Sequence, residues 1–243
     1  VVAGPDPQDP TASHVSIPDY SRALQGGLKG ITIGIPKDFF FDPTAVDPFV
    51  MTAVEEALQV IQEAGARVEE VSLPLLRLAP AIQFLTISSE ATANHSRLLR
   101  TRSRELGEDV RRRLEVGEFL GASQYVRAQQ ARGLLMREFS TAFGQVDLLV
   151  TPTVPVVAPP IGAQTVKIHN VPKRLQPTLT SFTSPFNLTG LPAISVPCSS
   201  GGDRLPVGLQ IVGRPFDEAT ILRAAFAYQQ ATPWHTHRPS LGK

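Results

Sequence analysis

The spacing of apolar and polar residues along the chain predicts a succession of strands and helices. Residues 30–36 (GITIGIP) form a β-branched run between glycine and proline, which is typical of a short buried strand. Residues 47–64 repeat apolar positions at helical spacing and are followed by Gly65, a natural C-terminal cap. Residues 67–73 alternate and stop at a proline. This order predicts a βαβ unit with a parallel strand pair and a right-handed crossover.

The rest of the chain adds more helix and a second group of strands. Residues 76–143 carry apolar positions every three to four residues and are punctuated by glycines, so we expect them to be mostly helical. Residues 146–150 predict a buried strand that leads into a proline-rich loop. Residues 193–198 and 206–213 predict a β-hairpin, and residues 217–232 a closing amphipathic helix. The predicted fold class is therefore α/β, with apolar strands covered by helices on their faces.

Charge and composition exclude several classes of partner. The 23 basic and 22 acidic side chains leave a formal net charge of +1, which predicts no nucleic-acid or membrane-surface binding. No apolar run reaches about 18 residues, and the first residues lack the pattern of a signal peptide, so we expect no membrane span and a cytoplasmic protein. The single cysteine, Cys198, fits a reducing compartment and leaves no zinc-binding cysteine pattern.

Several polar stretches could carry chemistry, and each has a structural alternative. Residues 199–202 (SSGG) could present a nucleophilic serine, but at a joint between two strands they are typical of a turn. The motif 235–237 (HTH) could bind a metal, but it lies in a tail. Three consecutive arginines, 111–113, lie on a predicted helix, where neighbours point about 100° apart. One of them can therefore face inward and bind a carboxylate, while the others meet solvent.

One neutral stretch, residues 181–198 (SFTSPFNLTGLPAISVPC), stands out because it contains no charged residue but many hydroxyls and turn formers. Its hydroxyls and the amide of Asn187 have no evident structural task, although Asn187 could also serve as a cap or turn residue. Residues 151–155 (TPTVP) follow a buried strand, and the chain beyond such strand ends is where open α/β folds build their sites. These two stretches are the candidate walls of a pocket.

These stretches closely resemble the C-terminal part of the amidase signature family. The resemblance also covers GLKGITIGIPKDFF, VEEALQVIQEAGARVEEVSLP, EDVRRRLEVGEFLGASQYVRAQQARG, DLLVTPTVPVVAPPIG and LPVGLQIVGRPFDEATILRAAFAYQQAT, in the family's order. It implies a mixed sheet flanked by helices on both faces. It also implies that residues 1–29 connect to an N-terminal catalytic half, and that residues 30–243 form the C-terminal part of a single amidase domain.

The resemblance implies a reaction but places its catalytic groups elsewhere. The family hydrolyses amides with a lysine, a bridging serine and a nucleophilic serine, without a metal or organic cofactor. None of the five lysines fits the family's catalytic position, so no catalytic residue is carried over. Arg113 matches an arginine that contacts a substrate carboxylate in the glutamine-using amidotransferase branch. Thr183 and Asn187 match positions beside the pocket, while Thr180 stands where that branch has an acid.

The sequence therefore predicts the pocket wall of an amidase that acts on a small-molecule amide, in a chain without the catalytic triad. A second hypothesis is a naturally shortened protein that binds amides or acids without cleaving them, or that pairs with a separate catalytic chain. An amidotransferase A subunit is disfavoured, because Thr180 offers no negative charge to a substrate ammonium group. Strands that have lost their sheet neighbours would also expose edges and favour a homodimer.

Overall fold

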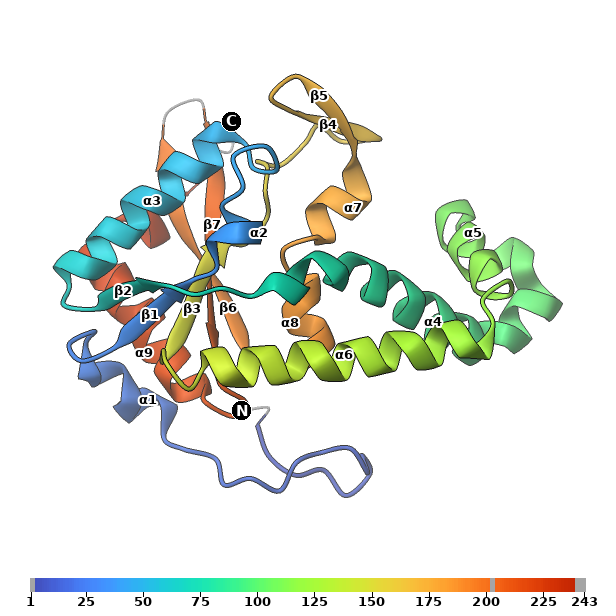
Figure 1. Ribbon diagram of the computed structural model, residues 1–243, viewed down its shortest axis with the longest axis horizontal. Helices are drawn as coiled ribbons and strands as arrows, with labels where there is room; N and C mark the ends of the chain where they lie inside the picture. Colours follow the sequence, from blue (N-terminus) through green and yellow to red (C-terminus); the bar gives the residue numbers. More distant parts are fainter. Residues whose placement is uncertain (1–2, 202–203, 239–243) are drawn as a thin grey trace.

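The computed structural model describes residues 3–201 and 204–238 and confirms the α/β class. Five described strands form one mixed sheet: β1 (Thr32–Ile35), β2 (Arg67–Glu70), β3 (Leu148–Pro152), β6 (Ala193–Gly201) and β7 (Arg204–Gly213). Their order across the sheet is β2-β1-β3-β7-β6 (Figure 1). A separate hairpin pairs β4 (Thr165–Ile168) with β5 (Val171–Arg174).

The helices account for most of the remaining chain. They are α1 (Tyr20–Ala23), α2 (Lys37–Phe40), α3 (Pro48–Glu63), α4 (Ala79–Arg102), α5 (Glu108–Gly117), α6 (Ala122–Ala142), α7 (Leu175–Thr180), α8 (Ser184–Thr189) and α9 (Glu218–Ala231). Short 3₁₀ turns are η1 (Leu24–Gly26), η2 (Pro74–Leu78), η3 (Ser103–Glu105) and η4 (Trp234–Thr236). Among the described helices, none combines the length and the apolarity that crossing a membrane requires.

The sheet topology agrees with the pattern of the sequence. Strand β1 pairs in parallel with both β2 and β3, so the predicted βαβ unit, with α3 as its crossover, is confirmed. Strand β7 runs antiparallel to both β3 and β6, which confirms the predicted hairpin. Every residue of β1 and β3 is buried, because the sheet is covered on both faces at its centre. Among the described strands, β2 and β6 have a neighbour on one side only.

Helices cover both faces of the sheet, as expected (Figure 1). Helices α3 and α9 lie on one face, and α2 and α8 lie on the other. The side chain of Asp47 caps α3 by accepting a hydrogen bond from the backbone N–H of Phe49, and Pro48 supplies the fixed φ suited to the first turn. Gly65, at a φ of 103°, follows the end of α3, where only glycine adopts such a conformation without strain.

The long helical region divides into an arm of three helices, α4, α5 and α6, which extends away from the sheet (Figure 1). Helices α4 and α5 approach closely at Gly117. A Cβ atom there would lie 2.0 Å from the Thr92 hydroxyl oxygen and 2.4 Å from the Ser88 carbonyl oxygen. Thr92 donates its hydroxyl to the carbonyl of Leu114 at 2.7 Å, so the contact buries a satisfied polar pair. The arm is thereby fixed at its far end.

Residues 1–29, expected to be a connector, include the short helix α1 and the turn η1. Both pack against α9 (Figure 1). Between residues 151 and 190, where the sequence indicated loop and pocket stretches, the structure forms β4, β5, α7 and α8. A turn was expected at 199–202, but β6 continues to Gly201 and β7 begins at Arg204, while residues 202–203 lie outside the described part.

Candidate functional site

The neutral stretch is fixed to the body of the protein by an aromatic cluster. Phe182 and Phe186 are each 2% exposed and flank the start of α8. The ring of Phe40 in α2 contacts both, with ring centroids 5.0 Å from Phe182 and 5.5 Å from Phe186. The ring of Phe139 in α6 lies 5.6 Å from that of Phe186. These contacts place residues 181–190 between the sheet and the helical arm.

Four hydroxyls of this stretch have a structural task that the sequence did not reveal. Each of the four donates to a backbone carbonyl three or four residues earlier. The pairs are Ser181 to Thr178 at 2.8 Å, Thr183 to Thr180 at 3.3 Å, Ser184 to Ser181 at 3.1 Å and Thr189 to Pro185 at 2.7 Å. Ser and Thr side chains commonly make such local bonds to backbone carbonyls.

A buried amide links the same stretch to the sheet. Gln210 on β7 is 4% exposed, and its Nε2 donates to the hydroxyl of Thr151 at 3.0 Å and to the carbonyl of Phe182 at 3.2 Å. Thr151 is fully buried on β3 and donates in turn to the carbonyl of Pro152 at 3.1 Å. The TPTVP stretch and the neutral stretch, predicted separately, therefore meet at this amide.

A cleft of about 1070 Å³ lies between the helical arm and the segment that contains α7. We call it the arm cleft. Its walls come from α4, α5, the two residues just before β4 and the junction of β5 with α7. Exposed apolar side chains line the arm side, namely Phe84, Ile87, Val110 and Val116. Polar and charged groups join them, including His95, Asp109, Arg113 and Arg174.

The three consecutive arginines of α5 differ in their ion pairs, although Arg112 and Arg113 both line the arm cleft. Arg112 pairs with Glu108, and the Nε of Arg111 lies 3.4 Å from a carboxylate oxygen of Glu115. Arg113 lines the arm cleft and has no ion-pair partner among the described residues. Its guanidinium is therefore available to an anionic or carbonyl-bearing ligand, for which the fork of N–H donors is well suited.

The other two predicted site residues lie outside the arm cleft. Thr183 is half-buried at the start of α8, and its carbonyl accepts the N–H of Asn187 at 3.1 Å. Asn187 is exposed and makes no side-chain hydrogen bond among the described residues. Neither side chain lines the cleft that contains Arg113. Arg113 therefore lines the arm cleft, whereas Thr183 and Asn187 belong to α8 and its N-cap, outside that cleft.

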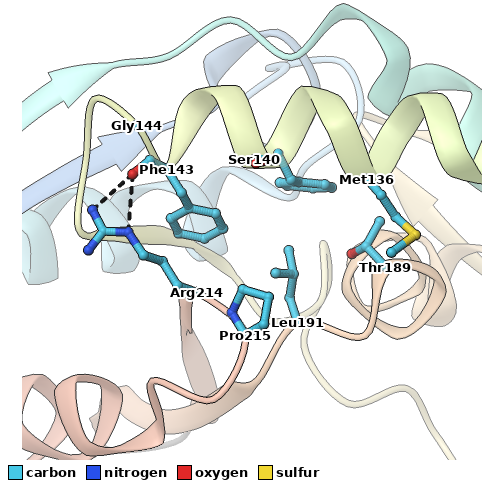
Figure 2. A pocket seen from close by; sticks show the side chains of 9 residues that line it. Met136, Ser140, Phe143, Gly144, Thr189, Leu191, Arg214 and Pro215 are labelled. Carbon is cyan, nitrogen blue, oxygen red and sulfur yellow. Dashed lines mark hydrogen bonds between the residues drawn. The ribbon is translucent and has the colours of Figure 1, made fainter.

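A smaller cavity of about 360 Å³ lies at the C-terminal end of α6 (Figure 2). Its lining is mostly apolar and includes Met136 and Leu191. Arg214 also lines it, but its guanidinium is engaged by the Phe143 carbonyl at 2.8 and 3.1 Å and by the Val146 carbonyl at 2.9 Å. With its cation already bonded, this cavity is less suited to a polar ligand than the arm cleft.

The described residues show no assembled nucleophile. Lys37 pairs with Glu70, and no lysine in the described part of the chain hydrogen-bonds a serine. Burial raises the pKa of the Cys198 thiol to about 12, so its reactive thiolate does not form near neutral pH. The residues described also contain no group of three or more His, Cys, Asp or Glu side chains that could hold a metal ion, and this includes the HTH motif.

Sequence reasoning missed Arg174 as a lining residue of the arm cleft. It ends β5, an element that was not predicted. The turn between β4 and β5 places His169 at a φ of 49° and Asn170 at 65°, values that asparagine tolerates better than most residues. The sequence signal that could have predicted this hairpin was the dipeptide His169-Asn170, which lies between two short runs that favour β-strands.

Comparison with known proteins shows a consistent relationship. The sequence profile of the family described as Amidase matches residues 1–222. The A subunit of glutamyl-tRNA(Gln) amidotransferase from Chloroflexus aggregans is 41% identical over 271 aligned positions, which cover 100% of this chain and 53% of that protein. The same subunit from Trichlorobacter lovleyi is 40% identical and is 53% covered. The chain thus spans about half the length of the curated relatives it matches.

Solved structures agree with this relationship. The glutamyl-tRNA(Gln) amidotransferase A subunit from Thermotoga maritima superposes with a TM-score of 0.73 at 31% identity, covering 95% of this chain and 48% of that chain. A protein from a vestigial complex related to an s-triazine catabolic enzyme gives a TM-score of 0.85 at 27% identity, covering 93% and 49%. A bacterial aryl acylamidase, at 23% identity and a TM-score of 0.80, shares the fold.

Proposed function

The chain belongs to the amidase family, and from this premise we propose that it forms the substrate-pocket wall of an enzyme that hydrolyses small carboxamides. In this reaction water cleaves the carbon–nitrogen bond of the amide, leaving a carboxylate and ammonia or an amine. The single cysteine, which fits a reducing compartment, favours a cytoplasmic site of action.

The observation that supports this role is the arm cleft with Arg113 in its wall. Apolar side chains of α4 and α5 offer a surface for the body of an organic amide, and Arg113 offers N–H donors to a carbonyl or carboxylate. Such a cavity, with an apolar lining and a few polar groups, is the common form of a small-molecule site.

We place the nucleophile outside these 243 residues. A serine hydroxyl at its ordinary pKa is a weak nucleophile and needs an adjacent base, and the described part of the chain holds no lysine–serine pair. In the proposed enzyme, a neutral lysine takes a proton through a bridging serine, a second serine attacks the amide carbonyl, and water releases the acyl group. These residues contribute substrate binding and part of the sheet.

A fluorophosphonate probe, which labels activated serines, tests the placement of the nucleophile. We expect no specific labelling of the 243-residue chain, and labelling of one serine in the protein extended to the length of its relatives. Stoichiometric labelling of a single serine in the 243-residue chain would contradict the proposal. Phenylmethylsulfonyl fluoride pretreatment of the extended protein is the control for active-site specificity.

Titration calorimetry with simple amides and carboxylates tests the pocket itself. We expect Arg113→Ala to weaken binding of a carboxylate-bearing amide by about 1.5–3 kcal/mol, the range for a hydrogen bond to a charged group. Arg104→Ala is the matched control, because Arg104 is exposed on η3 and does not line the arm cleft. Equal binding by wild type and Arg113→Ala would refute the assignment. Binding by an extended protein that cleaves no amide would instead favour a non-catalytic binding protein.

A second candidate is the A subunit of a glutamine-using amidotransferase, favoured by the 41% identity to such a protein. Against it, residue 180 is a threonine, which has no carboxylate to pair with a substrate ammonium group, and its hydroxyl donates to the carbonyl of Gln176 at 3.1 Å. Glutaminase assays on the extended protein distinguish the two. Ammonia release from glutamine by wild type would support the amidotransferase, whereas release only after Thr180→Asp would support the general amidase.

A further inference from the structure

We infer that Gln210 is a positioning residue that sets the orientation of the stretch 181–190 through the Phe182 carbonyl. The structural side of this inference rests on hydrogen bonds and ring contacts among the described residues. Its consequence for turnover rests on the proposed function and on the prediction from the family resemblance that Thr183 and Asn187 lie beside the substrate, although neither residue lines the arm cleft. Gln210 was not among the sites predicted from sequence.

The location of Gln210 is unusual for an amide side chain. It lies on β7, between β3 and β6, at 4% exposure, and its neighbours Leu209 and Ile211 are buried aliphatic residues of the sort that fill sheet interiors. A buried amide is costly unless its donors are bonded. Here both Nε2 donors have acceptors, on Thr151 and on the Phe182 carbonyl, so the polar group is accommodated by specific partners.

The acceptor on Phe182 explains what the amide controls. Phe182 lies between the last residue of α7 and the first residue of α8, so its carbonyl is outside both helices. Its ring is held by Phe40, with centroids 5.0 Å apart, but a ring contact does not fix the adjacent peptide plane. The hydrogen bond from Gln210 does, because the Phe182 carbonyl and the Thr183 N–H belong to one planar peptide unit.

Fixing this peptide plane fixes the start of α8. Thr183 is the N-cap residue of α8, and its carbonyl accepts the N–H of Asn187. Rotation of the Phe182–Thr183 peptide would therefore turn both predicted pocket residues. Gln210 also bonds Thr151, the first residue of the TPTVP stretch, so one buried side chain sets the register between the two predicted walls of the pocket.

Two matched substitutions separate positioning from general stability. Gln210→Met keeps the volume and removes the donors to both partners. Thr151→Val removes the bond between Thr151 and Gln210 but leaves the bond from Gln210 to Phe182. Hydrogen exchange measured by mass spectrometry on the full chain should show faster exchange of the peptide 183–190 in Gln210→Met, by about tenfold or more over Thr151→Val, at equal global stability. Equal exchange in the two variants would overturn the inference.

Gln210→Asn is a second variant that keeps the interior polar. Its side chain is one methylene shorter, so it cannot span from β7 to both acceptors, and we expect exchange in 183–190 between those of wild type and Gln210→Met. Unchanged exchange in this variant would also count against the inference. Gln210→Asn allows the inference to be tested even if Gln210→Met does not fold.

Kinetics on the extended protein test the consequence for catalysis. We expect Gln210→Met to raise KM for a small amide several-fold more than Thr151→Val does, because only the former disorders the start of α8. Similar KM values in both variants would overturn the catalytic consequence. If the wild-type extended protein cleaves no amide, the proposed function fails, while the exchange comparison still decides the role of Gln210.

Discussion

Truncating Phe186 is the sharpest test of how the neutral stretch is held. Phe186 is 2% exposed, stacks on Phe40 at an interplanar angle of 8°, and meets Phe139 with ring centroids 5.6 Å apart. It therefore joins α8 to both α2 and α6. Phe186→Ala would bury less apolar area, remove both ring contacts and leave a cavity where the ring was, and each of these changes lowers the stability of the folded state.

The magnitude follows from these contacts. Replacing a buried phenylalanine by alanine costs about 3–5 kcal/mol, and the two ring pairs, worth about 0.5–1.5 kcal/mol each, place this site in the upper part of that range. With a urea m-value of about 2 kcal/mol per molar, the unfolding midpoint should fall by roughly 2 M.

Equilibrium urea unfolding followed by circular dichroism measures the loss. Phe119→Ala is the matched control, since the side chain of Phe119 is 86% exposed and its truncation should change the free energy of unfolding by less than about 0.5 kcal/mol. A loss below about 1.5 kcal/mol for Phe186→Ala, with an unchanged m-value, would show that the aromatic cluster does not anchor α8.

Three further predictions use other parts of the molecule. Gly117→Ala should destabilise by about 1–3 kcal/mol in urea unfolding, because its Cβ would lie 2.0 Å from the Thr92 hydroxyl oxygen, whereas Gly133→Ala, with open space around its Cβ, should stabilise α6 by up to about 1 kcal/mol. Gly190→Ala should cost about 1–2 kcal/mol, because residue 190 ends α8 at a φ of 68°; a loss below about 0.5 kcal/mol would contradict this. Cys198 should resist iodoacetamide in the folded chain, because burial raises the pKa of its thiol to about 12. The free energy of unfolding should fall as pH rises from 9.0 towards 12, because the unfolded thiol loses its proton at a pKa near 9.0 while the folded thiol keeps it to about 12. A Cys198→Ala variant whose free energy of unfolding has the same pH slope would refute this assignment.

The local sequence pattern was sufficient to predict those helices and strands that have a clear periodicity of apolar residues. The β-branched run at 30–36, the apolar face of α3 and the alternation at 67–73 each carry their signal within a few residues, so the parallel unit and the right order of elements followed. The hairpin of β6 and β7 followed for the same reason. Family segments in the correct order then indicated the amidase fold, including its mixed sheet.

The candidate site was only partly accessible from sequence, because it depends on contacts between distant segments. The pattern of three arginines showed that one could face a ligand, but the ion pairs of Arg111 and Arg112 and the position of α7 identify Arg113 as the one that lines the arm cleft without a partner among the described residues. The assignments of Thr183 and Asn187 to a pocket remain predictions. Arg174 was missed because β5 is too short and too exposed to show a strand pattern.

The sequence by itself determined the composition of the neutral stretch, and the tertiary structure decided its use. Without charges, the stretch can lie between a sheet and a helical arm, and this much follows from the cost of burying unpaired ions. Whether its hydroxyls face a ligand or a carbonyl depends on where α7 and α8 end. Gln210 shows the limit most clearly, since a lone glutamine in an apolar strand reveals its role only when the strand, Thr151 and the Phe182 carbonyl are folded within hydrogen-bonding distance.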